Sequence, residues 1–211
     1  MNSTKLFLHC CCGPCALYPL QILREEGLEA IGYFYNPNVH PWREFRSRLE
    51  AFASMAGKTG LPARIEEGYG LEAFMIGMKG LGDDAYQAES ADRCRMCYRL
   101  RLEKTAAACR DAGIGAFSTT LLVSPYQRHD LIRETGEAVA EEYGLSFLYR
   151  DFRPGFRRGQ AMAKEMGLYR QGYCGCVFSE YGRYGSAKSP ASATGDAPLG
   201  KKEDGVYGTH A

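Results

Sequence analysis

Nine cysteines carry most of the reactive chemistry of this chain, and eight of them occur in three tight groups. The groups are Cys10, Cys11, Cys12 and Cys15 in HCCCGPC, Cys94 and Cys97 in RCRMCY, and Cys174 and Cys176 in GYCGC. A secreted disulfide-rich domain spreads its cysteines to join distant loops, whereas grouped cysteines in a reducing compartment are typical of metal binding or redox chemistry. The spacing therefore predicts cysteines that bind metal or exchange electrons.

The first two groups have the spacing of metal ligands. Neighbouring cysteines such as Cys11 and Cys12 point in different directions, which suits a polynuclear cluster or two adjacent metals better than a single ion. Cys94 and Cys97 form a C-x-x-C, in which two thiolates converge on one metal centre. Two cysteines from each group would supply the four thiolates of an iron–sulfur cluster. A structural zinc site is the alternative, although zinc sites usually use two C-x-x-C knuckles, and only one is present.

The third group predicts redox chemistry. One residue separates Cys174 from Cys176, so a disulfide between them would be strained and easily reduced. Such a pair suits a redox-active dithiol, while two further metal ligands or two idle thiols are the alternatives. Cys109 is different, since it lies in the alanine-rich stretch KTAAACRDAG and is expected to be a buried packing residue. Cys10 has no assigned role.

Other residues are weaker candidates. His9 is expected to pack rather than to bind metal, and Asp151 is an acid, a ligand or an ion-pair partner. Arginines surround Asp151 in RDFRPGFRR and form either a solvated face or a phosphate-binding patch. Aromatic residues that could stack on a nucleobase, or simply pack, are Trp42, Tyr98, Tyr126 and Tyr173.

The elements that must position these residues alternate along the chain. Apolar periodicity and glycine or proline stops predict strands at 5–8, 30–35, 63–66, 116–120 and 145–150, and helices at 16–26, 45–59, 71–79, 94–112, 131–143 and 160–166. This alternation predicts an α/β fold, a Rossmann-like three-layer sandwich with a parallel sheet. Ligands of such sheets bind at the carboxyl ends of the strands. The loops HCCCGPC, NPNVHP and TTLLVSPYQRH should therefore share one rim, with the cysteine-rich site there.

Composition limits the remaining possibilities. Residues 1–185 are expected to form one α/β iron–sulfur catalytic domain, and the Gly-, Ala-, Ser- and Lys-rich residues 186–211 a disordered tail. The sequence shows neither a signal peptide nor a membrane span, so we expect a cytoplasmic protein. With a net charge of +1, any nucleic-acid surface would be a local patch. The expected first strand is not followed by a glycine-rich phosphate loop, which argues against an adenylating or dinucleotide-binding enzyme.

Five segments, taken together, resemble the QueH-type epoxyqueuosine reductases over residues 5–179. They are LHCCCGPC, YNPNVHP, RCRMCYRLRL, TTLLVSPYQ and DFRPGFRRGQAMAKEMGLYRQGYCGCVFS. The resemblance implies an adenine-nucleotide-hydrolase-like fold and the last step of queuosine synthesis. In that step the epoxide oxygen of epoxyqueuosine is removed by two-electron reduction at the wobble position of the tRNAs for Asp, Asn, His and Tyr. It also implies that the enzyme works without cobalamin, with an electron donor of unknown identity.

The family pattern also implies residue roles. It places a [4Fe-4S] cluster on Cys11, Cys12, Cys94 and Cys97, a redox-active disulfide at Cys174 and Cys176, and a second iron beside the cluster, with Cys15 as its candidate ligand. Cys10 departs from the small residue common at its position, so which two of the three consecutive cysteines bind metal stays open. The epoxide oxygen would bind an open iron position, with Asp151 or a nearby tyrosine as proton donor.

Two other classes of protein remain as alternatives. A tRNA-thiolating enzyme on a similar fold would need an SGGxDS-like ATP loop after the first strand, where this chain has LHCCCGPC. A zinc-stabilised nucleic-acid-binding module would be colourless, whereas a cluster enzyme would be brown.

Overall fold

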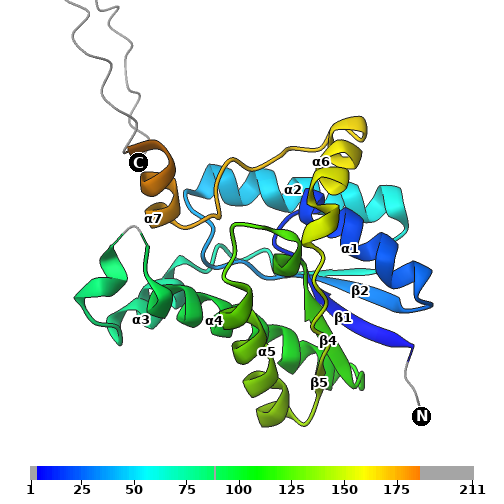
Figure 1. Cartoon of the computed structure of the whole chain (residues 1–211), viewed down its shortest axis with the longest axis horizontal. Coiled ribbons are helices and arrows are strands. Elements are labelled where there is room, and N and C mark those ends of the chain that lie inside the picture. Colours follow the sequence, from blue (N-terminus) through cyan, green and yellow to red (C-terminus); the bar gives the residue numbers. More distant parts are fainter. Residues whose placement is uncertain (1–3, 88, 186–211) are drawn as a thin grey trace, which may run out of the picture.

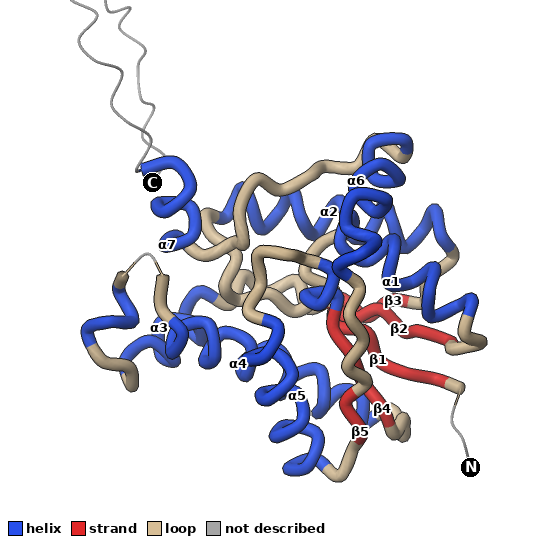
Figure 2. Tube along the Cα trace, viewed as in Figure 1, coloured by secondary structure: helices blue, strands red, loops and turns tan. Residues whose placement is uncertain are grey.

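A five-stranded parallel sheet forms the centre of the molecule. The structure is a computed structural model that describes residues 4–87 and 89–185, and the strands run in the order β3-β2-β1-β4-β5 (Figures 1 and 2). The strands are β1 (Lys5–His9), β2 (Glu29–Phe34), β3 (Ala63–Ile65), β4 (Ala116–Thr119) and β5 (Ser146–Phe147). The expected α/β fold with a parallel sheet is confirmed. The tail predicted at residues 186–211 lies outside the described residues.

Helices cover both faces of the sheet and make the three layers. The α-helices are α1 (Gly13–Glu25), α2 (Trp42–Thr59), α3 (Leu71–Lys79), α4 (Ala91–Asp111), α5 (His129–Tyr143), α6 (Phe156–Glu165) and α7 (Val177–Glu180). Helix α1 packs between α2 and α6 on one face, while α4 and α5 pack together on the other (Figure 1). Short 3₁₀ segments are η1 (Asp83–Tyr86), η2 (Thr120–Val123) and η3 (Arg153–Gly155), and a π-helical turn is η4 (Tyr181–Gly185).

Local capping explains where the helices near the cysteines begin and end. The Cys12 side chain accepts the Cys15 amide and caps α1, and Ser90 caps α4 by accepting the Arg93 amide. Helix α2 ends where Gly60 adopts a left-handed conformation. Both α1 and α4 begin earlier than the apolar periodicity predicts, because their first turns carry cysteines and polar residues rather than a regular apolar stripe.

The strand predicted at 145–150 is shorter than expected. Only Ser146 and Phe147 pair with β4, and a last ladder bond joins the Leu148 amide to the Phe117 carbonyl at 2.8 Å. Beyond that bond the chain leaves the sheet, and the Phe152 amide bonds to the Leu122 carbonyl instead. Residues 148–150 are half-buried or exposed, so the apolar run of this segment predicts a longer strand than the chain forms.

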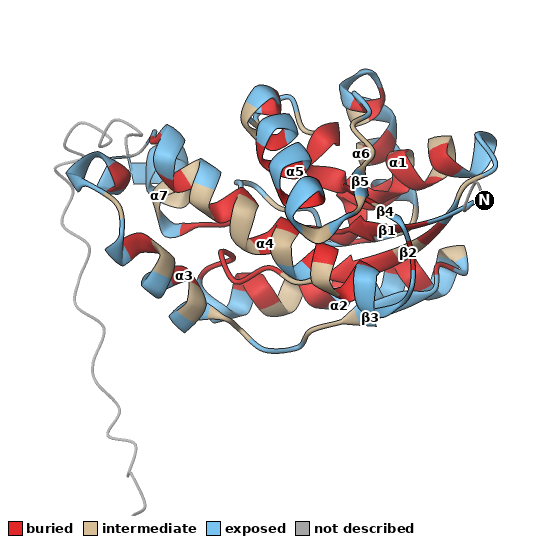
Figure 3. Cartoon of the chain, turned by 90° about the horizontal axis from the view of Figure 1, so that it is seen from below, coloured by how far each residue is buried: buried red, intermediate tan, exposed pale blue. Residues whose placement is uncertain are grey.

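The core lies between the sheet and the inner faces of the helices, where buried residues concentrate (Figure 3). It includes Leu6, Leu8, Phe34, Phe52 and Phe117. Among the described residues, none of the helices combines the length and the apolar character that a membrane crossing requires.

The three unusual loops meet at one end of the sheet, as expected. The Asn36 side chain in the loop after β2 donates to the Cys10 carbonyl at 2.9 Å, and the Cys11 amide donates to the Thr120 hydroxyl at 3.2 Å. Strand order changes direction between β1 and β4, so this end of the sheet has the crevice where open α/β sheets bind ligands.

Candidate metal and redox centre

The first sulfur group consists of Cys11, Cys12 and Cys15, at the start of α1. Their Sγ atoms all lie within 4.8 Å of one another and all three residues are buried. The Cys11 and Cys12 sulfurs are 3.8 Å apart, and the Cys12 sulfur accepts the Cys15 amide at 3.4 Å. Because the helix begins between them, one turn of backbone brings three thiols together at its amino end, where amide dipoles favour thiolate.

One thiolate is stabilised within this group. Hydrogen bonds with the Cys12 and Cys15 thiols, and one with Thr120, lower the pKa of Cys11 well below its usual value. Burial raises the pKa of Cys12, and interaction with Cys11 and Cys12 raises that of Cys15. The group thus favours one deprotonated thiol, whose negative charge the three sulfurs share. A bound cation would favour loss of the remaining two thiol protons as well, because metal ligands are thiolates.

Neighbouring residues of the first sulfur group have structural roles. Cys10 is fully buried, and its thiol donates to the Leu8 carbonyl at 3.2 Å, away from the other three. His9 uses both ring nitrogens, on the Thr119 hydroxyl at 2.8 Å and the Tyr35 carbonyl at 3.3 Å. These contacts support the packing role expected for His9 and leave Cys10 outside the group of three close thiols.

The second sulfur group consists of Cys94, Cys97, Cys174 and Cys176. Cys94 and Cys97 lie one turn apart near the start of α4, and Cys97 is buried with Cys176 against Phe74. Burial raises the pKa of Cys97 to about 12, with smaller contributions in the same direction from Cys174 and Cys176. Cys97 of the C-x-x-C and Cys176 of the C-x-C therefore lie in one buried cluster, which is the contact between the two motifs.

The two predicted cysteine pairs of the cluster fall in different sulfur groups. Within the described residues, Cys11, Cys12 and Cys15 are the one set of three or more ligand atoms within 4.8 Å of one another. Each cysteine of a polynuclear cluster binds its own iron, so the cysteine sulfurs need not touch one another. A ligand set drawn from both sulfur groups therefore stays a prediction. All nine cysteines lie within the described residues and are free thiols, Cys174 and Cys176 included.

Arg48 connects the third cysteine motif to α2. This buried side chain donates to the Tyr173 carbonyl at 2.9 Å and the Cys174 carbonyl at 2.8 Å, and it pairs with Glu44 at 2.7 Å. Gly175 has φ of +139°, and an added Cβ would lie 3.2 Å from the Arg48 Nη1 atom. Arg48 and the glycine together fix the turn that carries both cysteines.

Arg101 is a second buried arginine, on α4. Its Nη2 atom lies 3.2 Å from the Cys97 sulfur and its Nε donates to the Cys97 carbonyl at 3.0 Å. Unlike Arg48, it forms no ion pair with a carboxylate in the described part of the chain. A buried cation without a carboxylate is costly unless another anion balances it, and the nearby sulfurs are the groups that can supply this charge.

Two glutamines and an asparagine add polar atoms around the sulfurs. Gln171 donates to the Cys15 sulfur at 3.1 Å and Gln127 to the Cys174 sulfur at 3.2 Å. The Gln171 Oε1 atom and both polar atoms of the Asn38 amide are buried without a hydrogen-bond partner. Because buried polar atoms are nearly always paired, these atoms fit a site that takes a further group. The donor set of thiols and an unbalanced arginine suits a thiolate-bound metal cluster.

Asp151 lies outside both sulfur groups. Its carboxylate bonds to the Arg153 guanidinium at 2.6 and 2.8 Å, and these bonds lower the pKa of Asp151 to about 2. The carboxylate is therefore ionised at neutral pH, which matches the ion-pair alternative among the three that the sequence leaves open. A catalytic role for Asp151 stays a prediction.

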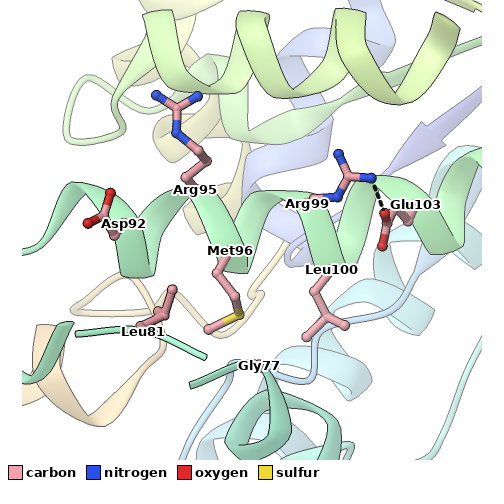
Figure 4. A pocket seen from close by; sticks show the side chains of 8 residues that line it. All are labelled: Gly77, Leu81, Asp92, Arg95, Met96, Arg99, Leu100 and Glu103. Carbon is pink, nitrogen blue, oxygen red and sulfur yellow. Dashed lines mark ion pairs between the residues drawn. The ribbon is translucent and has the colours of Figure 1, made fainter. Parts of the chain in front are cut away.

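A surface depression of about 410 Å³ between α3 and α4 is separate from the cysteines (Figure 4). Residues of the outer face of α4 line it, including Arg95 and Arg99. Arg95 pairs with Glu134 at 2.9 Å, and Arg99 with Glu103 at 2.7 Å. Because these arginines are neutralised and no cysteine lines the depression, we assign no chemistry to it.

Comparison with known proteins agrees with the cysteine site. A sequence model of the family described as epoxyqueuosine reductase QueH matches residues 6–182, a span that contains all nine cysteines. The chain belongs to the epoxyqueuosine reductase QueH family. It is therefore an oxidoreductase, with a reductive role in queuosine synthesis, and the resemblance stated from its motifs is confirmed.

Individual members of the QueH family are similar over nearly their whole length. A protein named epoxyqueuosine reductase QueH from Dehalococcoides mccartyi is 38% identical over 189 residues, which cover 90% of this chain and 100% of that protein. A protein of the same name from Thermotoga maritima is 37% identical over 176 residues, covering 82% and 89% of the two chains.

Sequence reasoning missed the two buried arginines and the two glutamines. The positions of the two arginines on their helices could have indicated them. Arg101 follows Cys94 and Cys97 by seven and four residues, on the same helical face. Arg48 lies between Phe45 and Leu49 on the apolar face of α2, where a charged residue needs an explanation. The contacts of Gln127 and Gln171 depend on loop geometry and left no such pattern.

Proposed function

We propose that this protein reduces epoxyqueuosine to queuosine at the wobble position of tRNA, without cobalamin. The observation that carries the proposal is the buried group of three thiols, Cys11, Cys12 and Cys15, directly after β1 in a member of the reductase family. Removal of the epoxide oxygen consumes two electrons and two protons. Both C–O bonds break, a carbon–carbon double bond forms, and water leaves.

The proposed cofactor is a [4Fe-4S] cluster on Cys11, Cys12, Cys94 and Cys97, with an adjacent iron at Cys15. When bound, these groups would transfer electrons and polarise the epoxide oxygen as a Lewis acid. The chain contributes the charge of Arg101 beside Cys97 and that of Arg48, which interacts with Cys11 and Cys12. Gln171 orients the Cys15 sulfur through its amide. These contacts hold the ligands in place and offset the negative charge of several thiolates.

Cys174 and Cys176 are proposed as the dithiol that supplies the reducing equivalents. Oxidation of two thiols to a disulfide releases two electrons and two protons, which matches what the epoxide consumes. Burial raises the pKa of Cys174, so the thiol keeps its proton until the reaction needs it. An external donor of unknown identity would then reduce the disulfide again.

The test uses protein purified without oxygen and loaded with iron and sulfide. Full-length tRNA carrying epoxyqueuosine is incubated with it and a low-potential reductant, without cobalamin, and the nucleosides are measured by mass spectrometry. We expect queuosine from the native protein and a large loss of product in Cys97→Ser. No queuosine from a protein with a full cluster would contradict the proposal, and a colourless protein with one zinc per chain would favour the zinc-stabilised module.

A further inference from the structure

One loop contacts the exposed cysteine of the second sulfur group. Cys174 is the only exposed residue among the nine cysteines and Cys94 is half-buried, while the other seven are buried. The Cys174 sulfur accepts the Gln127 amide at 3.2 Å, and Gln127 in turn accepts the Tyr98 hydroxyl at 2.8 Å. The loop of residues 124–128 between η2 and α5 therefore lies directly beside Cys174.

Tyr126 in this loop is the aromatic residue best placed to stack on a base. It is 81% exposed, and its ring makes a perpendicular contact with the Phe156 ring at 6.0 Å, so most of the ring surface is open to solvent. The other aromatic candidates are engaged: Tyr98 is buried, Tyr173 is half-buried and donates to the His40 carbonyl, and Trp42 stacks on Phe45. Proteins that bind single-stranded RNA use such open rings as stacking platforms.

Three exposed arginines lie close in sequence to Tyr126 or to its ring partner Phe156. Arg128 is exposed, and its backbone amide donates to the Tyr98 hydroxyl at 3.3 Å, beside Gln127 and the loop. Arg157 and Arg158 are exposed in the first turn of α6, directly after Phe156, and that turn has no acidic residue. Within the described part of the chain these three arginines form no ion pair, whereas Arg150 and Arg153 are paired with Glu26 and Asp151.

Helix stability does not explain the two arginines of α6. The amino end of a helix favours acidic residues, because its free amides carry partial positive charge. Arginines there add to the positive potential, which is unfavourable for folding and favourable for binding phosphates. Contact between Tyr126 and Phe156 joins this helix end to the loop beside Cys174, so the stacking ring and the cations form one surface.

We propose that Tyr126, Arg128 and the first turn of α6, here called the loop–α6 surface, bind the single-stranded anticodon loop of the tRNA. Tyr126 stacks on a base at or next to the modified nucleotide, and Arg128, Arg157 and Arg158 bind the flanking phosphates. This assignment rests on the proposed function, because it takes tRNA as the substrate. It names the surface that brings the modified base to the sulfurs.

The experiment measures binding of the cluster-loaded, full-length chain to an RNA stem–loop with guanosine at the wobble position. This RNA has no epoxide, so its affinity is independent of the reduction. We expect Tyr126→Ala to weaken binding about 5- to 150-fold with an unchanged salt dependence. Tyr126→Phe should bind like the native chain, and Tyr126→Leu, which keeps apolar bulk without a π face, should behave like the alanine variant.

The charge variants separate phosphate contacts from stacking. Arg128→Gln should reduce the slope of log affinity against log salt by about 0.7, the value for one phosphate contact on a single strand. Arg110→Gln is the matched control. Arg110 is exposed near the carboxyl end of α4, which leads into the start of β4 and so lies at the opposite end of the strands from the loops, and it stacks on Tyr143. Its loss should change neither affinity nor slope.

The outcomes distinguish this inference from the proposed function. If the native chain produces queuosine while Tyr126→Ala and Arg128→Gln bind the RNA as tightly as it does, the loop–α6 surface is wrong and the proposed function stands. If the native chain binds the RNA through Tyr126 but produces no queuosine, the surface stands and the proposed function is wrong. Visible absorption of the cluster in each variant shows that the site has folded.

Discussion

Arg48 and Arg101 are both buried beside sulfur, but different groups neutralise them. Arg48 has Glu44 at 2.7 Å, whereas the recorded contact of Arg101 that could become anionic, by binding metal as a thiolate, is the Cys97 sulfur at 3.2 Å. At short range in a protein interior, one unit charge changes the energy of another by several kcal/mol. Arg101 therefore affects the charge that the sulfurs and any metal bound to them can carry.

We predict that Arg101→Met lowers the midpoint potential of the bound cluster by about 60 mV or more. Each 59 mV corresponds to a tenfold change in a one-electron equilibrium, and removal of a buried cation disfavours the more negative, reduced state. Arg101→Lys keeps the charge and should shift the potential less. A redox titration followed by visible absorption and electron paramagnetic resonance measures both variants. Equal potentials in native protein and Arg101→Met would contradict the argument.

His9 gives a prediction on pH. Burial and the charge of Arg101 lower the pKa of His9 from 6.5 to about 4, so the folded chain holds it neutral while the unfolded chain protonates it below pH 6.5. Its contribution to stability is present above pH 6.5 and is lost as the pH falls toward 4. Between pH 7 and pH 5 the loss is about 2 kcal/mol.

Urea unfolding of the metal-free, reduced chain at these two pH values measures the effect of His9. His9→Asn has no group that titrates in this range, so its free energy of unfolding should fall by about 2 kcal/mol less than that of the native chain. Parallel pH profiles for the two proteins would show that His9 does not titrate in the way stated.

At the residue scale, the sequence predicted the reactive groups better than it predicted their partners. Cysteine spacing is local, so C-C-x-x-C, C-x-x-C and C-x-C could be interpreted directly. Which sulfurs meet depends on how α4 and the 174–176 turn pack, and this is why the 3.8 Å contact of Cys11 with Cys12 and the burial of Cys97 with Cys176 required the structure.

Helices α1 and α2 cross at Gly13, within the segment that carries the first sulfur group. A Cβ added at Gly13 would lie 2.4 Å from the Ala51 carbonyl oxygen and 3.2 Å from the Met55 Cβ atom. Backbone cannot yield as a flexible side chain does. The glycine therefore sets how closely the start of α1, with Cys12 and Cys15, approaches α2.

We predict that Gly13→Ala destabilises the protein by about 1–3 kcal/mol and reduces its iron content. The added methyl forces α1 away from α2, a typical cost of overpacking, and moves the first sulfur group with it.

Gly57→Ala is the matched control. Gly57 lies on α2, the other helix of this crossing, and nothing lies within 4 Å of its Cβ position. It should stabilise the protein by about 0.5–1 kcal/mol. Urea unfolding and iron analysis of both variants test the pair, and similar results for the two would contradict the argument.

At the element scale, the sequence predicted the kind of element well and its ends less well. The helix predicted at 71–79 matches α3, but α6 begins at Phe156 rather than at residue 160. The short helix α7 was not predicted, since a four-residue helix has no periodicity to detect. Its position after Cys176 follows from hydrogen bonds of the Cys176 carbonyl with the Ser179 and Glu180 amides.

The two sulfur groups belong to different layers of the molecule. The first is on α1, which packs with α2 and α6, and most of the second is on or against α4, which packs with α5 on the other face. A cluster with ligands from both groups would join the two helical layers across the carboxyl ends of β1 and β4.

We predict that loading with iron and sulfide raises the melting temperature by at least about 5 °C. A ligand present at a hundred times its dissociation constant adds about 2.7 kcal/mol of stability, and each kcal/mol shifts the melting temperature by about 2–4 °C in a chain of this size.

Cys12→Ser and Cys97→Ser, one from each sulfur group, should each remove most of the increase in melting temperature. Cys109→Ser is the control and should keep the increase, because that thiol bonds to the Ile114 carbonyl in the core. Thermal unfolding without oxygen, followed by circular dichroism, measures the shift. If Cys12→Ser removes the increase and Cys97→Ser leaves it intact, the metal binds the first sulfur group alone and does not join the layers.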